Sequence, residues 1–233
     1  SCESSLERVF ALRLTNLVML RQELTSKSLS SSTIPKGKLR IIEGGSGVGK
    51  STVVNGLSRY GHKIIQDDIS KNPFIAMTKS DKSIPDSAML CQLGFRLPKL
   101  EQLYNHLLGE ECDCNAFVDR WILTEDAHIK YFKEHNKISS EGVEILNRIN
   151  ECLYPILAQY CLFSLLTASD QALTERIAAR GRSYELNRDA LEMQLEVNGN
   201  IREVISESYP GLQVTVVDTT DLLPGDVLDL YLK

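Results

Sequence analysis

Short apolar runs alternate with longer amphipathic stretches along most of the chain, a pattern that predicts buried strands separated by helices. The predicted strands cover residues 39–43, 62–65, 115–118, 160–166 and 213–217. The predicted helices cover residues 51–60, 88–108, 122–135, 140–159, 170–180 and 188–208. This alternation favours an α/β fold with three layers, in which helices cover both faces of a five-stranded parallel sheet.

The N-terminal residues follow a different pattern. Apolar residues recur near the helical period between residues 5 and 27, and a serine run and a proline follow them. We therefore expect an accessory helix and a linker over residues 1–37, ahead of the main domain at residues 38–233. An organelle presequence is the alternative, because the segment contains arginine and serine. Glu3, Glu7 and Glu23 argue against a presequence and favour a cytoplasmic protein.

Composition and charge narrow the function classes. The chain has 233 residues, of which 42% are hydrophobic and 24% charged, as in a folded globular protein. A net charge of −5 argues against a protein that coats a nucleic acid polymer or an anionic membrane. The longest apolar stretch, residues 153–166, is shorter than the roughly 20 residues of a membrane span. The six cysteines form no C-x-x-C pair, so we expect reduced thiols rather than a metal site.

A glycine-rich segment after the first predicted strand carries the strongest chemical signal. Residues 44–51 read Gly-Gly-Ser-Gly-Val-Gly-Lys-Ser and match G-x-x-x-x-G-K-[ST], with a helix predicted next. Glycines let successive backbone N–H groups turn onto phosphate oxygens, Lys50 reaches the β- and γ-phosphates, and the Ser51 hydroxyl can bind Mg²⁺. The motif predicts a P-loop NTPase fold that binds ATP and Mg²⁺. The predicted nucleotide-binding residues are Gly44, Gly45, Ser46, Gly47, Val48, Gly49, Lys50, Ser51 and Thr52.

Two acidic residues follow the second predicted strand. Asp67 and Asp68 follow the apolar residues 64–65, with Gln66 in between. Ligands bind at the carboxyl ends of strands in open α/β sheets. A carboxylate at this edge can accept the proton of an acceptor hydroxyl during phosphoryl transfer, and Asp67 is the predicted base. The alternative is an aspartate pair that caps the next turn.

The third predicted strand ends in a charged pair, Asp119 and Arg120. Asp119 suits a direct or indirect role on Mg²⁺, and Arg120 can bind phosphate oxygens through its planar guanidinium. A surface ion pair is the alternative interpretation.

Three arginines flank a glycine near the end of a predicted helix. Arg176 and Arg180 lie four residues apart on one helix face, and Arg182 follows Gly181. Guanidinium groups beside a helix break are typical of a lid that stabilises the transferring phosphoryl group. A solvated basic helix end is the alternative.

Together these motifs resemble the deoxynucleoside kinases, which transfer the γ-phosphate of ATP to the 5′-hydroxyl of a deoxynucleoside. The resemblance runs from residue 39 to about residue 217. In that family the second strand ends in a catalytic Glu, usually within Glu-Pro, and Asn-Pro-aromatic follows shortly. Here Asp67 takes the position of the base, and Asn72, Pro73 and Phe74 follow. The chain departs from the family because Asp is one methylene shorter than Glu and the first proline is missing.

The resemblance also implies roles for further residues. Gln92 would read the nucleoside base, and Lys99 stands where the family usually has Arg. Trp121 replaces the Ser of the family's Asp/Glu-Arg-Ser motif, and the Tyr of the family's lid helix has no counterpart near Gly199. The implied catalytic residues are Lys50, Asp67, Arg120, Arg176, Arg180 and Arg182, with Ser51 and Asp119 toward the metal. The implied substrate-binding residues are Asp68, Phe74, Gln92, Lys99, Trp121, Tyr184 and Glu185; Phe74 or Trp121 would stack on the base, and Tyr184 and Glu185 would hold the sugar.

Three alternatives remain at this point. Thymidylate kinases carry an Asp-Arg-aromatic motif followed by Ser and Ala, similar to residues 119–127, but their Arg-Glu-Pro-Gly-Gly stretch has no counterpart here. Nicotinamide riboside and uridine kinases carry an acidic pair after a strand, as at Asp67 and Asp68. A non-catalytic nucleotide-binding module or switch is the third alternative, and the arginine-rich lid argues against it. We expect a small-molecule nucleoside or nucleotide as the partner, with a homodimer as one arrangement that the N-terminal helix allows.

Overall fold

The computed structural model describes residues 39–67, 71–72, 74–75, 86–108, 116–181 and 188–232. The predicted accessory helix and linker lie outside the described residues, as do the closely spaced Cys112 and Cys114.

A five-stranded sheet forms the middle layer, and every neighbouring pair of its strands is parallel. Its order is β2-β3-β1-β4-β5. The strands are β1 (Leu39–Glu43), β2 (Lys63–Ile65), β3 (Ala116–Asp119), β4 (Cys161–Thr167) and β5 (Val214–Asp218). The predicted parallel sheet is therefore confirmed, and each strand lies within two residues of its predicted position.

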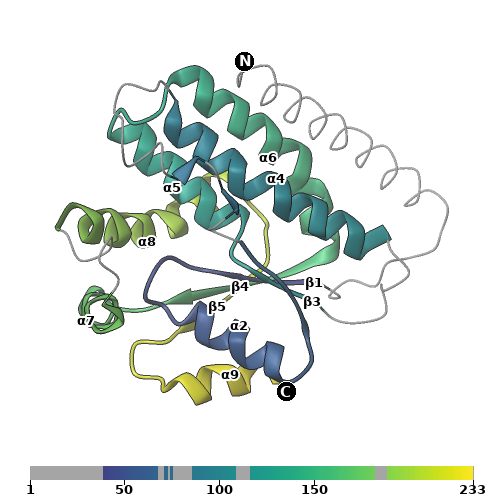
Figure 1. The fold of residues 1–233 in the computed structure, drawn as a ribbon, viewed down its shortest axis with the longest axis vertical. Helices are drawn as coiled ribbons and strands as arrows, with labels where there is room; N and C mark the ends of the chain where they lie inside the picture. Colours follow the sequence, from purple (N-terminus) through teal and green to yellow (C-terminus); the bar gives the residue numbers. More distant parts are fainter. Residues whose placement is uncertain are drawn as a thin grey trace.

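Helices cover both faces of the sheet, as the alternating pattern predicts (Figure 1). On one face lie α2 (Lys50–Arg59) and α9 (Pro224–Leu232). On the other lie α4 (Ser87–Leu108), α5 (Ile122–Glu134), α6 (Ser140–Tyr160) and α8 (Arg188–Ser208). A further helix, α7 (Asp170–Arg180), precedes α8 in the chain and lies beside it in Figure 1.

The two faces of β1 explain the two hydrophobic cores. Ile41 faces the larger cluster together with Val118, Leu146 and Phe163, beneath α4, α5, α6 and α8. Its neighbour Ile42 faces the smaller cluster beneath α2 and α9. A strand buried on both faces has a continuous apolar sequence rather than an alternating one, which is why the run at residues 39–43 was recognisable.

Helix α9 was not predicted from the sequence. It begins at Pro224 and Gly225, a dipeptide that more often marks a turn. Val227 and Tyr231 are buried in the smaller cluster, and Gly56 of α2 lets Leu228 approach closely, since a Cβ at Gly56 would lie 2.5 Å from Leu228 Cδ2. Tertiary packing on α2 therefore stabilises this short helix, and the local sequence carries little sign of it.

The topology brings three strand ends to one edge. The strands β1, β2 and β3 are adjacent and parallel, so the segments that follow them emerge on the same side of the sheet. After β3 the chain crosses to the other side of β1 and forms β4, so β1 lies where the strand order reverses. Such reversals leave a crevice at the carboxyl ends of the strands.

Among the helices of the described residues, none combines the length and apolar character that crossing a membrane requires.

Candidate active site

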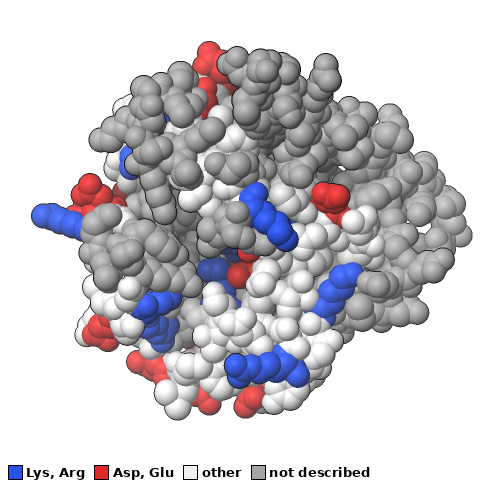
Figure 2. Space-filling view, viewed as in Figure 1, with Lys and Arg blue, Asp and Glu red and all other residues white. Residues whose placement is uncertain are grey.

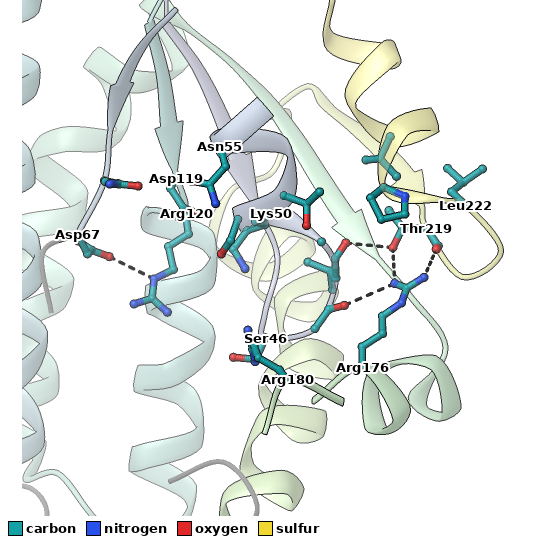
Figure 3. A pocket seen from close by; sticks show the side chains of 18 residues that line it. Ser46, Lys50, Asn55, Asp67, Asp119, Arg120, Arg176, Arg180, Thr219 and Leu222 are labelled. Carbon is teal, nitrogen blue, oxygen red and sulfur yellow. Dashed lines mark hydrogen bonds and ion pairs between the residues drawn. The ribbon is translucent and has the colours of Figure 1, made fainter. Parts of the chain in front are cut away.

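A cavity of about 580 Å³ opens at this carboxyl edge of the sheet (Figure 3). Figure 2 shows a hollow near the centre of the same view as Figure 1, with basic and acidic atoms at its bottom. The cavity is lined by residues that follow β1, β2 and β3, by α7, and by the connection from β5 to α9. The lining residues are Ser46, Gly47, Val48, Gly49, Lys50, Ser51, Thr52, Asn55, Gln66, Asp67, Asp119, Arg120, Arg176, Arg180, Thr219, Leu222, Pro224 and Val227.

The glycine-rich loop after β1 has the backbone that phosphate binding requires. Gly47 and Gly49 have φ angles of +87° and +98°, in the left-handed region that residues with a side chain rarely adopt. Gly49 also caps α2 without any side-chain hydrogen bond, so no side chain covers the first N–H groups of the helix there. These N–H groups and the positive end of the helix dipole favour an anion in the cavity.

A buried carboxylate fixes the start of this loop. Glu43, fully buried at the end of β1, accepts hydrogen bonds from the N–H groups of Leu123 (3.2 Å) and Thr124 (3.1 Å) and from the Thr124 hydroxyl (2.6 Å). Thr124 in turn accepts a hydrogen bond from the N–H of Gly44 at 3.0 Å. Glu43 therefore caps α5, whose own N-cap residue Trp121 supplies no side-chain hydrogen bond. Sequence reasoning missed Glu43, since its partners lie about 80 residues away.

Gly44 and Gly45 do not line the cavity, although both were predicted to contact the nucleotide. The N–H of Gly44 donates to Thr124 Oγ1, and the N–H of Gly45 donates to Asn198 Oδ1. These two N–H groups hold the loop in place, whereas the groups from Ser46 to Thr52 face the cavity.

Lys50 is positioned by the loop it belongs to. Its Nζ donates a hydrogen bond to the carbonyl oxygen of Gly45 at 2.5 Å. Burial lowers the pKa of Lys50 to about 8, and the neighbouring Asp119 carboxylate offsets only part of this effect. An incoming phosphate would supply the negative charge that the buried ammonium lacks.

Asp67 and Arg120 meet on the acceptor side of the cavity (Figure 3). The Asp67 carboxylate forms ion pairs with Lys99 Nζ at 2.9 Å and with Arg120 Nε at 3.3 Å. Arg120 has a φ of +44°, an unusual value for a residue with a side chain, and its N–H donates to the carbonyl of Ile42 at 2.9 Å. Burial alone would lower the pKa of Arg120, but the carboxylates of Asp67 and Asp119 outweigh that effect and raise it.

Lys99 does not line the cavity, although the resemblance implied a substrate-binding role for it. The side chain is buried behind Asp67, and its Nζ also donates to the backbone carbonyl of Arg120 at 2.8 Å. Lys99 therefore positions the proposed base and the turn after β3. The physical reason is that α4 packs beside β2, so the long side chain of Lys99 reaches Asp67 after β2 and Arg120 after β3.

Asp119 and Ser51 provide oxygen ligands that fit Mg²⁺. Both residues line the cavity. Asp119 Oδ1 is buried and has no hydrogen-bond partner among the described residues. A buried carboxylate oxygen without a partner is costly unless a cation or water binds it, and Mg²⁺ prefers such oxygens together with waters. Both predicted metal ligands thus line the same cavity.

The arginines of α7 line the opposite wall (Figure 3). Arg176 donates to the carbonyl oxygens of Thr219 (2.6 Å) and Thr220 (3.1 Å) and to Thr219 Oγ1 (3.1 Å). Its guanidinium therefore binds the turn after β5 as well as facing the cavity. Arg180 lines the cavity as predicted. Sequence reasoning missed Thr219, whose hydroxyl also donates to the backbone of Val48 or Thr167.

Three predicted substrate-binding residues lie away from the cavity lining. Trp121 is packed in the larger core, so its ring presents no stacking surface to the cavity. The reason is that Trp121 links a buried strand to a buried helix start. Phe74 and Gln92 are also buried and do not line the cavity. Asp68, Arg182, Tyr184 and Glu185 lie outside the described residues.

A buried polar network continues from Lys99 into the core. Glu125 Oε2 lies 2.8 Å from Arg96 Nε, and its other oxygen lies 3.7 Å from Lys99 Nζ. Arg96 Nη2 lies 3.1 Å from Asp126 Oδ1, and the Tyr209 hydroxyl donates to the other oxygen of Asp126. Burial raises the pKa of both Glu125 and Asp126. Positive and negative side chains alternate along this network, so each buried charge has a partner of opposite sign. The apolar pattern that predicted a helix over residues 122–135 did not predict the network.

Comparisons with known proteins identify the family of the chain. The family model for deoxynucleoside kinases matches residues 41–207, well over half of the chain, so the chain belongs to the deoxynucleoside kinase family. No curated protein sequence matches it significantly.

Solved structures share the fold. Deoxyadenosine kinase from M. mycoides with bound dCTP has a TM-score of 0.66 and 23% identity, over 83% of this chain and 96% of that chain. The same enzyme with bound dATP gives 0.63 and 22%, over 83% and 97%. Thymidylate kinase from Candida albicans gives 0.52 and 22%, over 84% and 90%. At these identities the structures establish the fold, and the family match identifies the chain as a phosphotransferase, an ATP-dependent nucleoside kinase.

The low pKa of Lys50 predicts that ATP binding weakens at high pH. Above about pH 8 the free protein loses the ammonium charge that faces the phosphates. The Kd for ATP should therefore rise roughly tenfold between pH 8 and pH 9.5, as measured by calorimetry. Lys50→Arg is the control, because arginine stays protonated and its Kd should stay flat over this range. An equally flat wild-type profile would contradict the assignment.

Proposed function

We propose that this kinase transfers the γ-phosphate of Mg-ATP to the 5′-hydroxyl of a deoxynucleoside, with Asp67 as the general base. One observation carries the proposal: Asp67 and Arg120 line the same cavity as Lys50 and the phosphate loop. A phosphoryl group bound at Lys50 and a hydroxyl bound at Asp67 would thus meet inside one enclosure, which is the positioning that phosphoryl transfer requires.

On the donor side, the chain supplies charge and backbone N–H groups. The residues from Ser46 to Thr52 would bind the phosphates, and Lys50 would contact the β- and γ-phosphate oxygens. Ser51 and Asp119 would hold Mg²⁺, which neutralises phosphate charge when bound. Arg180 and Arg120 line the same cavity as Lys50 and would stabilise negative charge as it develops on the transferred group.

On the acceptor side, Asp67 has the chemistry of a base that is held in place. Lys99 and Arg120 each approach one of its carboxylate oxygens. Oδ1, beside Lys99, is buried, but Oδ2 has a second lone pair that can accept a hydrogen bond from a hydroxyl. The two cations fix the orientation of the carboxylate at the cavity lining.

The spacing of two residues on helix α4 can be compared with the length of the acceptor. Gln92 precedes Lys99 by seven residues, which places both on one helix face about 10 Å apart along the axis. Lys99 forms an ion pair with Asp67, the proposed base, so the 5′-hydroxyl would lie near this end of the Gln92–Lys99 segment. A nucleoside has a comparable length from its 5′-oxygen to the far edge of its base. On this spacing and on the family resemblance, Gln92 is the proposed base-reading residue, although it is buried and lies outside the cavity lining described above. Asp68, Tyr184 and Glu185 are proposed for the sugar and the 5′-end on the resemblance alone.

A nucleoside monophosphate is the alternative acceptor. The thymidylate kinase structure aligns with a lower TM-score than the deoxyadenosine kinase structures, 0.52 against 0.66 and 0.63. The carboxylate of Asp67 at the acceptor end also suits a hydroxyl better than a phosphate, because two like charges would face each other there.

The proposal predicts ADP release that depends on a nucleoside. With Mg-ATP alone the rate should be at background, and one or more of the four deoxynucleosides should raise it at least about tenfold. The matched control is the 5′-deoxy analogue of the active nucleoside, which lacks the acceptor hydroxyl and should restore the background rate. Activity with thymidylate or nicotinamide riboside, and with no deoxynucleoside, would contradict the proposed acceptor.

The proposed base predicts a specific kinetic defect. Asp67→Asn preserves the shape and the position of the side chain but removes the proton acceptor, so kcat should fall by about 10²–10⁴-fold. The Kd for ATP should stay within about threefold, since Asp67 does not belong to the phosphate loop. Asp68→Asn is the matched comparison, measured by the same coupled assay. A large loss in Asp68→Asn and none in Asp67→Asn would show that the neighbouring carboxylate is the base.

A further inference from the structure

One side chain that does not line the cavity forms hydrogen bonds with the backbone of the phosphate loop. Asn198 of α8 accepts a hydrogen bond from the N–H of Gly45 at 3.1 Å, and its Nδ2 lies within reach of the Ser46 carbonyl at 3.4 Å. The same Nδ2 donates to the carbonyl of Gln194 at 2.8 Å, which holds the amide in a fixed orientation on the helix. Asn198 is not among the residues that line the cavity.

The two atoms that Asn198 holds flank the carbonyl group that orients Lys50. The N–H of Gly45 and the carbonyl of Ser46 lie on either side of the peptide unit that joins these residues. The oxygen of that peptide unit, Gly45 O, accepts the hydrogen bond from Lys50 Nζ. A change in the position of Asn198 would therefore rotate the carbonyl on which the lysine rests.

Gly45 is matched to Asn198 by size. Its φ angle is not positive, unlike those of Gly44, Gly47 and Gly49, so backbone conformation does not require glycine here. A Cβ at this position would lie 2.4 Å from Asn198 Nδ2 and 2.5 Å from Asn198 Cγ. The glycine thus leaves room for the asparagine carboxamide, although the two residues are 153 positions apart.

We propose that Asn198 is a positioning residue for donor-nucleotide binding: it locks the Gly45–Ser46 peptide so that Lys50 and the downstream N–H groups point into the cavity. The inference rests on the proposed function, because it takes ATP as the ligand of the loop. It assigns the role to α8, whose residues 188–208 the sequence presented only as an amphipathic helix.

The test uses Asn198→Ala, Gly45→Ala and the double variant in the full-length protein. Each single change breaks the same contact, by truncating the amide or by displacing it. Each should raise the Kd for ATP by about five- to tenfold in calorimetry, while the KM for the nucleoside stays within about twofold. The double variant should bind ATP no more weakly than either single variant, since the three atoms nearest to a Cβ at position 45 all belong to the Asn198 amide that the second change removes.

Asn200→Ala is the matched control. Asn200 is a buried asparagine two positions further along α8, so its side chain points away from the loop side of the helix. Its change should leave the Kd for ATP within about twofold, even if the melting temperature falls. Additive effects in the double variant, an unchanged Kd in both single variants, or an equal loss of ATP and nucleoside affinity would overturn the proposal.

The outcomes separate this inference from the proposed function. If the wild-type chain binds no ATP, or if Lys50→Ala binds it as well as wild type does, the proposed function fails. If the wild type binds ATP, Lys50→Ala loses it, and Gly45→Ala behaves as wild type, the role of Asn198 alone fails. Gly45→Ala keeps the test decisive should Asn198→Ala not fold.

Discussion

The buried carboxylate of Glu43 fixes the distance between the two halves of this active site. Glu43 ends β1, directly before the phosphate loop, and its oxygens cap the first turn of α5. The same turn continues from Asp119 and Arg120 at the end of β3. The Glu43 carboxylate thus connects the phosphate loop to the segment after β3 that carries Asp119 and Arg120. Thr124 adds a second connection, because its hydroxyl oxygen accepts a hydrogen bond from the N–H of Gly44. A buried charge that makes three hydrogen bonds is costly to disturb, so the geometry it sets is rigid.

The charged side chains of the cavity lie on the segments that this arrangement holds together. Among the described lining residues, four are basic and two are acidic, an excess that suits a polyanionic ligand. Arg120 and Lys99 pair with Asp67. Within the part of the chain that the structure describes, the Lys50 ammonium hydrogen-bonds only a backbone carbonyl, and the Asp119 carboxylate offsets only part of the effect of burial, so its low pKa and its readiness to bind phosphate share one cause. Fixed charges in a partly desolvated site need little reorganisation during the reaction. Such electrostatic preorganisation is usually the largest single contribution to catalysis.

Local sequence patterns predicted the features that depend on local physics. The continuous apolar run at residues 39–43 and the glycine loop after it identify the central strand and the phosphate site, because burial and left-handed glycines leave direct marks in the sequence. The charged residues that end β2 and β3 could be placed at one edge because parallel strands align their carboxyl ends.

Features that depend on contacts between distant residues could not be predicted. Lys99 behind Asp67, Asn198 behind Gly45 and Glu43 at α5 each join elements far apart in sequence, and each residue type has many solvated roles. Trp121 was assigned to the substrate by analogy with a motif, but burial decides its place in the core. Helix α9 begins with a Pro-Gly pair that is typical of turns, and its packing on α2 stabilises it as a helix.

A bisubstrate analogue tests most directly whether donor and acceptor share one cavity. Such a compound joins adenosine and a deoxynucleoside through their 5′-oxygens by a chain of phosphates. If Lys50 and Asp67 face a common space, calorimetry should show the analogue binding at least about 10²-fold more tightly than ATP, because the second half binds without a further loss of translational freedom. An analogue that binds no more tightly than ATP would contradict the account.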